Sequence, residues 1–456
     1  MLKNEKNNYW KKRGIPGPKP SLPFKGNIDL IFNKNPSSLQ LYRWSKIYGN
    51  IYGIKNGWIN SLIISEPKMV KELLFDKFEN FYGHLVNPMI GDVNTTSMVH
   101  LFASKGKRWK RLRYIANPAF STFNLKRVMP IMNDIIQNNI QQLKKTYKTG
   151  EFINLLDYFT DLTFSVIYRI TMGGQKEDSK EFCQLSKDTL TRFNNNIFDY
   201  FSYIFPWLGR TVLSPFINAT GRLRRDPTHI LIEKIYEASE AENNTIELVE
   251  HTGTFNRAEK VEKNDRRNTL DEIVLNILLF LLTGFDTTAN TLSLISHNLV
   301  MYPNVQKKLF EEIEEICGLE EGEMPTYEQL INRVCEETTT LGNITIEKGI
   351  AVSVDLFTLH RDKNIWGEDA EQFKPERWLN EEGNIITPSS SFYPFGGGPR
   401  ICIGMRLGIM EIKMILVQLL RTFELKRCSK TETKFNFSGQ IVLNPETITV
   451  ELNSKQ

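Results

Sequence analysis

The sequence predicts a mainly α-helical protein with small β-sheets, built around one long buried helix. Three observations lead to this fold class. An almost unbroken apolar run from Ile273 to Leu282 belongs to a helix that we expect from about Leu270 to Tyr302. A glycine-rich loop around Cys402 is followed by an amphipathic helical stretch. The β-rich runs are short and lie near the two ends of the chain.

The composition is that of one large globular protein. Its 456 residues are 41% hydrophobic and 24% charged, which leaves enough apolar side chains for a sizeable core. The net charge of +4 is small and evenly spread, so it gives no argument for nucleic acid binding. Five cysteines without paired spacing predict reduced thiols in a cytosol-facing chain. We expect a single domain over residues 1–456, with a polar and proline-rich beginning (1–26) and a folded body (27–456).

The amino-terminal segment is first polar and then rich in proline. Residues 1–14 hold no apolar run, so neither a signal peptide nor a membrane span is predicted there. Residues 15–26 (IPGPKPSLPFKG) cannot be helical and are expected to form a stiff connector. The β-rich runs NIYGIK and WINSLIIS then flank Asn56-Gly57, a pair typical of type I′ turns, and predict a hairpin.

From about residue 67 onward we expect mainly helices. The stretch KGKRWKRLRYIANPAF predicts a cationic helix interrupted near Pro118. Residues 193–217 are rich in aromatic side chains and are broken by Pro206 and Pro215. Charge dominates residues 233–268, which predicts a solvated connection. After residue 434, the alternating runs KFNF and ETITVEL predict strands around a turn at Ser438-Gly439.

The long helix is predicted to begin at a capping box formed by Thr269 and Glu272, and to stop before Pro303. The polar sequence TGFDTTAN interrupts its apolar run well short of the length that a membrane span needs. We therefore expect this helix to lie buried within the protein.

The polar sequence in this helix predicts a local groove. Threonine hydroxyls can bond to carbonyls one turn earlier and bend the helix. Gly284 would let a planar ligand approach the backbone. Asp286 supplies an acid able to relay protons, and Thr287 supplies a hydroxyl able to steady bound oxygen. Alternatively, the patch only satisfies its own hydrogen bonds.

The run FGGGPRICIG has five positions that together point to a metal-bound thiolate: Phe395, Gly398, Arg400, Cys402 and Gly404. The glycines allow a tight loop, and the following helix places the sulfur near a helix amino terminus, which stabilises negative charge. That arrangement suits an axial thiolate on haem iron, with Arg400 as a cation for a carboxylate of the same ligand. The alternative is a free cysteine in a tight turn.

Taken with the patch in the long helix, this loop resembles the cytochrome P-450 family. Every defining position of that family's haem-binding loop is present, and the long-helix motif differs only at Thr283, where alanine is usual. Trp109-x-x-x-Arg113 resembles the family's propionate-binding helix, and Arg333 lies in a segment that resembles the strand whose arginine also meets a propionate. Residues 373–378 (FKPERW) resemble the segment before the haem loop. The likeness covers nearly the whole chain and is closest to the microsomal type with broad substrates.

The resemblance implies a cytochrome P-450 fold with haem between the long helix and the cysteine loop. Cys402 would ligate the iron, and Gly284, Asp286 and Thr287 would serve oxygen activation. The residues expected to bind the cofactor are Trp109, Arg113, Arg333, Phe395, Gly398, Arg400 and Gly404.

The activity implied is that of a haem-thiolate monooxygenase, an oxidoreductase that inserts one oxygen atom from O2 into a small apolar substrate (a xenobiotic, steroid or fatty-acid-like molecule). Nothing in the chain is similar to a flavin or nicotinamide fingerprint, so an NADPH-dependent flavoprotein reductase would supply the electrons. Five cations could offer it a docking surface: Lys107, Lys110, Arg111, Arg406 and Lys413. The alternative is that these are ordinary solvated helix faces.

Two departures from the family pattern stand out. The apolar anchor expected before the connector is not present in this sequence, although the family implies the cytosolic face of the endoplasmic reticulum membrane. Peripheral contact through residues 198–207 would remain, unless these aromatics belong to the core. The Glu-x-x-Arg helix is also missing, because Tyr327–Leu330 runs directly into the segment of Arg333.

The missing helix, about 25 residues with its loop, is expected to leave Arg377 without its partner. Substitution by Glu336 or Glu337 stays open, although no spacing argument supports it. Glu424–Arg427, the one Glu-x-x-Arg of the chain, is interpreted as chance. Three alternatives to a monooxygenase therefore stay open: a degenerate relative or truncated isoform without stable haem or turnover, a haem-thiolate isomerase, and a binding module without haem.

Overall fold

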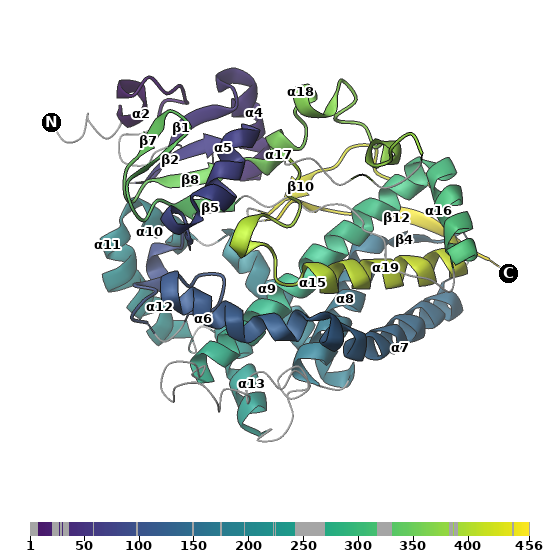
Figure 1. The fold of residues 1–456 in the computed structure, drawn as a ribbon. Coiled ribbons are helices and arrows are strands. Elements are labelled where there is room, and N and C mark those ends of the chain that lie inside the picture. Colours follow the sequence, from purple (N-terminus) through teal and green to yellow (C-terminus); the bar gives the residue numbers. More distant parts are fainter. Residues whose placement is uncertain are drawn as a thin grey trace.

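The computed structural model confirms a mainly helical fold with small sheets (Figure 1). It describes residues 8–20, 27, 30, 36–57, 59–96, 99–147, 150–173, 176–195, 197–221, 223, 225–241, 270–316, 331–382, 386, 391–439 and 442–455. The helices are α2 (Tyr9–Lys12), α4 (Ser37–Tyr48), α5 (Pro67–Lys71), α6 (Gly106–Ala116), α7 (Thr122–Thr146), α8 (Leu155–Met172), α9 (Lys176–Asn195), α10 (Ile197–Ile204), α11 (Pro206–Leu208), α12 (Ser214–Gly221), α13 (Pro227–Ala241), α15 (Leu270–Met301), α16 (Pro303–Ile316), α17 (Leu356–Leu359), α18 (Lys363–Trp366) and α19 (Met405–Thr422).

The strands form four small sheets. Their bounds are β1 (Ile51–Asn56), β2 (Ile59–Ile64), β3 (Gly83–His84), β4 (Phe152–Asn154), β5 (Ile331–Val334), β6 (Thr339–Leu341), β7 (Ile344–Ile346), β8 (Ala351–Val354), β9 (Phe423–Lys426), β10 (Phe437–Ser438), β11 (Asn444–Pro445) and β12 (Thr449–Ser454). The largest sheet, in the order β1-β2-β8-β5-β3, lies apart from the helical mass (Figure 1).

The predicted amino-terminal hairpin is confirmed, with its turn one residue later than expected. Asn56 still pairs with Ile59, so the turn begins at Gly57 rather than at Asn56. Gly57 has a φ of 58°, and a Cβ there would lie 2.2 Å from the carbonyl oxygen of Tyr203. Glycine is therefore required at this position both by the positive φ and by the close approach of the Tyr203 carbonyl group.

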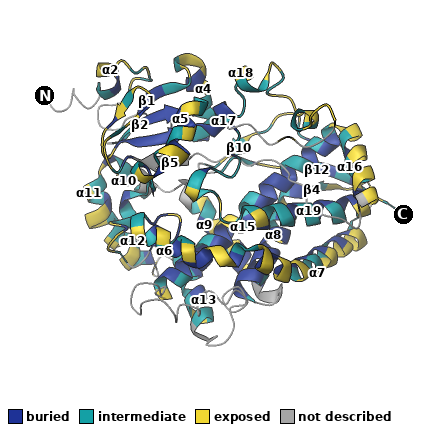
Figure 2. Cartoon of the chain, viewed as in Figure 1, coloured by how far each residue is buried: buried dark blue, intermediate teal, exposed yellow. Residues whose placement is uncertain are grey.

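The predicted long helix is α15, which crosses the middle of the helical part and is largely buried (Figure 2). It packs most extensively against α8 and also contacts α13, α19 and α16. Among the described residues, α15 is the one helix long and apolar enough to cross a membrane, and 67% of its most apolar stretch is buried inside the protein. It is thus the core helix of the fold, as the sequence predicts.

One further prediction is confirmed and two need adjustment. The cationic helix ends at Ala116 and passes into a 3₁₀ turn over Asn117–Phe120, as expected near Pro118. The stretch predicted as a solvated connection is helical up to Ala241 in α13, and the rest of it lies outside the described residues. The two carboxyl-terminal runs do not pair with each other, because β10 pairs with β11 whereas β12 pairs with β4 and β9.

Candidate functional site

The Cys402 loop has the tight backbone that its glycines predict. The N–H of Cys402 donates to the carbonyl oxygen of Phe395 at 2.9 Å and closes the loop. Gly398 has a φ of 67°, and a Cβ there would lie 2.0 Å from the carbonyl oxygen of Leu74. Gly404, in contrast, has a φ of −86° and its nearest neighbour would be 3.8 Å away. The loop therefore needs glycine at 398 much more strictly than at 404.

The thiol of Cys402 lies at the amino terminus of α19, as predicted. The backbone N–H groups of Gly404 and Met405 donate to its sulfur, and Arg113 lies close enough to favour the thiolate electrostatically. Burial nevertheless raises the pKa of the thiol above its usual range, although the side chain is accessible to solvent. A bound metal cation would reverse this balance, because coordination removes the thiol proton. The donor set therefore fits a metal thiolate.

Arg400 is held in place by the segment that precedes α6. Its Nη2 donates to the carbonyl oxygen of Ser104 at 2.6 Å, and its Nη1 to that of Phe102 at 3.4 Å. The guanidinium also lies over the ring of Trp109, 4.5 Å from the ring centre. The structure thus brings together Arg400 and Trp109, which are far apart in sequence.

Arg113 lies one turn beyond Trp109 on α6, as the i, i+4 spacing predicts. Burial lowers the pKa of its guanidinium, and the nearby thiol of Cys402 opposes that shift. Arg333 lies on β5, where its backbone pairs with His84 of β3. The side chain of Arg333 falls outside the part of the chain that the structure describes.

The cysteine loop meets α15 through an apolar cluster. Ile403 packs with Trp109 and Phe120 against Leu279 and Phe280, which lie one turn before the polar patch of α15. A planar apolar cofactor with carboxylates at one edge would find a thiolate, aromatic side chains and arginines in this region. Haem therefore fits the residues present: Cys402 would ligate its iron, and Trp109, Arg113 and Arg400 would serve its carboxylates.

The polar patch of α15 forms the predicted back-bonds. The Thr283, Thr287 and Thr288 hydroxyls donate to the carbonyl oxygens of the residues four positions earlier, at 2.7–2.8 Å. Thr283 is exposed and Thr287 partly exposed, although Leu282 and Phe285 beside them are buried. One face of the core helix is therefore open to solvent at the patch. α15 nevertheless remains one continuous helix from Leu270 to Met301.

Gly284 has a packing role that the sequence did not predict. A Cβ at this position would lie 2.7 Å from Cγ1 of Ile167 on α8. Glycine here lets α15 and α8 pack closely, whereas we expected it to admit a planar ligand. The approach of a planar ligand to Gly284 stays a prediction.

Asp286 has two asparagine neighbours that the sequence did not predict. Nδ2 of Asn444 lies 3.4 Å from both carboxylate oxygens of Asp286. Asn290 donates to the Asp286 carbonyl oxygen at 2.7 Å and to the Asn444 amide oxygen at 3.1 Å. Burial raises the pKa of Asp286 to about 6, and the two amides act against that shift. The spacing Asp286–Asn290 could have shown one partner, but Asn444 comes from a distant turn.

The predicted docking cations do not share one environment. Lys107 and Arg406 are exposed, and Lys110 forms an ion pair with Glu79 at 3.1 Å on the surface. Arg111 instead points inward to the buried carboxylate of Glu272. Arg111 is therefore not part of the exposed positive surface. The predicted capping box of Glu272 with Thr269 cannot be followed, because Thr269 lies outside the described residues.

Arg377 has partners despite the missing helix. Its Nη1 donates to the Trp366 carbonyl oxygen at 2.8 Å, and its Nη2 contacts both the carbonyl oxygen and, at 3.2 Å, the carboxylate of Asp369. Our expectation that Arg377 would be left alone was wrong, because the preceding turn supplies these acceptors.

Glu336 and Glu424 form ion pairs with other residues. Glu336 pairs with Lys105 at 3.0 Å, far from Arg377 in sequence. Glu424 lies on β9 and pairs with Lys426, so the chance Glu-x-x-Arg does not form a helix. Tyr327–Leu330, where the deletion is predicted, lies outside the described residues.

Comparison with known proteins identifies the family of the chain. Residues 16–332 and 324–452 match the family model of cytochrome P450, and the two matches meet where the missing helix is predicted. Three Caenorhabditis elegans cytochromes P450, CYP13A7, CYP13A10 and cyp-13B1, are 32%, 33% and 32% identical, each over 98% of this chain and 95% of its own length. The CYP13A7 alignment spans 503 positions, so this relative contains segments that the 456-residue chain lacks. The chain belongs to the cytochrome P450 family.

Proposed function

We propose that the chain is a haem-thiolate monooxygenase that oxidises a small apolar substrate, with residues 27–456 as its catalytic body. Membership of the cytochrome P450 family implies this type of chemistry, a haem cofactor, O2 and a reductase partner. The observation that carries the proposal is the sulfur of Cys402, which accepts two backbone N–H groups at the amino terminus of α19. When bound, haem supplies the activation of dioxygen and the transfer of one oxygen atom to the substrate.

The chain's own residues hold the cofactor and deliver protons in this proposal. Arg113, Arg400 and Trp109 lie together beside the Cys402 loop and suit the carboxylates of the cofactor. Arg333, whose backbone lies on β5, is the fourth proposed contact, as the family resemblance implies. Phe395, Gly398 and Gly404 shape the loop.

Asp286 is the proposed proton relay. Its pKa of about 6 lets it exchange protons near neutral pH, and Asn444 orients it. Thr287 is partly exposed on the same helix and offers a hydroxyl to oxygen. A haem-thiolate isomerase would not need this proton relay, so the presence of Asp286 and Thr287 favours a monooxygenase.

An apolar substrate is supported by the segments before α6. Val93, Val99 and Ala103 form a small buried cluster with Val86 and Ile90 packed against it. Beside them, Phe102 is half exposed (50%) and stacks on His84 with ring centres 4.5 Å apart. The accessible apolar side chains of this region are Phe102 and the partly buried Val86 and Ile90, and they favour hydrophobic molecules over charged ones.

Two surfaces support the proposed partners. An NADPH-dependent flavoprotein reductase would dock at the cations around Cys402, chiefly Lys107, Lys110 and Arg406. Peripheral contact with the cytosolic face of the endoplasmic reticulum would use exposed aromatics of α10–α12: Phe201 (40%), Trp207 (65%) and Phe216 (52%). Amphipathic aromatic rings favour the membrane interface, and their exposure argues against the alternative that they belong to the core.

The absorption spectrum of the purified protein, reduced under carbon monoxide, tests the proposal. We expect a thiolate-type Soret band, which Cys402→Ala should abolish while Cys428→Ala leaves it intact. Absence of any haem signal in the unmodified chain would instead support the degenerate relative. Substrate oxidation that needs no NADPH or reductase would point to the isomerase.

A further inference from the structure

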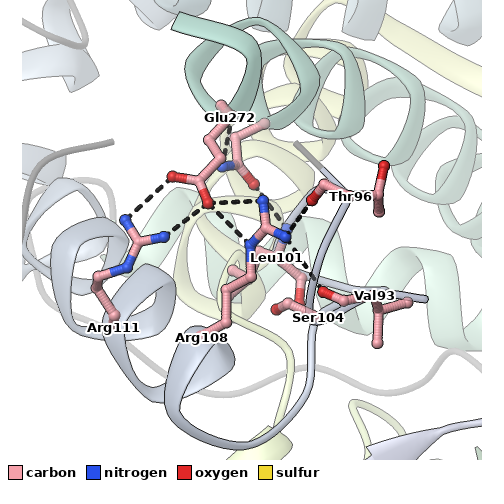
Figure 3. A network of polar contacts seen from close by, with 8 residues as sticks. Val93, Thr96, Leu101, Ser104, Arg108, Arg111 and Glu272 are labelled. Carbon is pink, nitrogen blue, oxygen red and sulfur yellow. Dashed lines mark hydrogen bonds and ion pairs between the residues drawn. The ribbon is translucent and has the colours of Figure 1, made fainter. Parts of the chain in front are cut away.

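A buried carboxylate joins α15 to α6. Glu272 is 1% exposed. Its Oε1 accepts from Nε of Arg108 at 2.9 Å and from Nη2 of Arg111 at 2.6 Å, and its Oε2 accepts from Nη1 of Arg111 at 3.0 Å (Figure 3). The two arginines lie three residues apart and therefore on one face of α6. Such a cluster is costly to break, because a lost partner leaves a buried charge uncompensated.

The same cluster holds the backbone in front of α6. Arg108 also donates through Nη1 to the carbonyl oxygens of Val93 and Thr96 (Figure 3). One turn along α15, Asn276 accepts the Leu101 N–H at 2.8 Å and donates to the Glu272 carbonyl oxygen at 2.7 Å. The amino-terminal part of α15 thus fixes the start of the segment over residues 101–104, which we call the lead-in segment.

The other end of the lead-in segment holds the Cys402 loop. The Ser104 hydroxyl donates to the Leu101 carbonyl oxygen at 2.7 Å, which makes the segment a compact turn. The carbonyl oxygens of Phe102 and Ser104 then accept the two Nη atoms of Arg400. Arg400 stands two residues before Cys402. The carboxylate of Glu272 is thus connected to the cysteine through Arg108 and the backbone in front of α6, and then through Arg400 and two residues of main chain.

We propose that Glu272 is a positioning residue for the Cys402 loop, acting through the lead-in segment and Arg400. It would do so by fixing the direction of the two carbonyl groups that hold Arg400, with no contact to the cysteine itself. The other interpretation is a local ion pair that only joins α6 to α15. The two differ in one consequence: only positioning makes the Cys402 loop respond to a change at Glu272.

Hydrogen exchange of the full-length chain separates the two interpretations. In Glu272→Gln, we expect amide exchange to rise on the order of tenfold both in the lead-in segment and in residues 395–404. The matched control is Asp271→Asn, the same chemical change at the adjacent residue, whose carboxylate accepts from the hydroxyl of Tyr236. The control should leave both regions unchanged. Faster exchange in the lead-in segment with an unchanged 395–404 region would overturn the proposal.

A second variant covers the case in which Glu272→Gln does not fold. Asn276→Ala removes the link to the Leu101 N–H without leaving a buried charge, and it should loosen the same two regions to a smaller extent. If both variants exchange like the unmodified chain in residues 395–404, the proposal is wrong.

The spectrum under carbon monoxide adds a readout that rests on the proposed function. With haem bound, Glu272→Gln should convert part of the thiolate-type band to the thiol type, and Asp271→Asn should not; an unchanged thiolate band in Glu272→Gln would argue against positioning. If the unmodified chain shows no haem signal, the proposed function fails, while the exchange measurement still decides the role of Glu272.

Discussion

Burial of Asp286 raises its pKa and makes the free energy of unfolding depend on pH. Its pKa is raised from the ordinary 3.8 to about 6, because burial disfavours the charged carboxylate. The folded chain therefore binds this proton more tightly than the unfolded chain does. Consequently, the free energy of unfolding that Asp286 contributes is fully present below pH 4 and is lost as the pH rises through about 6.

Asp286→Asn should therefore stabilise the protein at neutral pH. A neutral amide avoids the cost of the buried charge, so the variant should gain up to roughly 2–3 kcal/mol above pH 7 and nearly nothing near pH 4. Urea unfolding at pH 5 and pH 8 measures the difference. Asn444→Leu should act in the opposite direction, because it removes a donor that lowers the pKa of Asp286. A pH-independent effect of Asp286→Asn would contradict this account.

Gly398 and Gly404 should respond very differently to alanine. Gly398→Ala places a Cβ 2.0 Å from the Leu74 carbonyl oxygen at a φ of 67°, so the loop must shift. We expect a loss of roughly 1–3 kcal/mol from backbone strain alone, and less haem per protein. Gly404→Ala meets its nearest atom at 3.8 Å and is the matched control. Thermal unfolding and haem content measure both; equal losses would show that crowding at Leu74 is not the cause.

At the scale of elements, the contact between α15 and α8 depends on Gly284. Gly284→Ala would bring a Cβ within 2.7 Å of Ile167. Overpacking of this kind typically costs about 1–3 kcal/mol. Ile167→Ala removes the clashing atoms, so the double variant should be more stable than the sum of the single effects predicts. A double-mutant cycle from urea unfolding measures this coupling, and strictly additive effects would exclude it.

The sequence predicts elements well where local chemistry decides them. The apolar run of α15 and its end before Pro303 are read from neighbouring residues, as are the hairpin of β1 and β2 and the helix after Cys402. The sequence does not reveal contacts and strand pairings that depend on a segment distant in sequence. The close approach at Gly284 comes from α8, and β12 pairs with β4 rather than with the run next to it in sequence.

The same division holds at the site. The motif spacing predicts Cys402, Arg400, Trp109 and Arg113, and the structure places them together. Asn444 and the buried position of Arg111 could not be predicted, because each depends on a partner more than 150 residues away in sequence.

At the scale of the whole molecule, the exposed cations around Cys402 should set the rate of electron delivery. Lys107→Glu should raise the KM for the reductase roughly three- to tenfold at low salt, and the effect should fade at high salt because exposed charges are screened. Lys307→Glu on α16, where the side chain is also exposed (76%), is the control and should change little. Steady-state turnover against reductase concentration measures both. An effect of Lys107→Glu that persists in high salt would show that charge is not its cause.

The Cys402 loop also constrains how the protein is made. Gly398 of this loop lies against the Leu74 carbonyl oxygen. Arg400 donates to the carbonyl oxygens of Ser104 and Phe102, which lie 296 and 298 residues earlier in sequence. Contacts of such long sequence separation form late in folding. A nascent chain still attached to the ribosome cannot complete the loop until residues 395–404 have emerged. Cofactor loading is therefore expected only after the loop has emerged, and ribosome-bound chains that stop before residue 402 should acquire no haem.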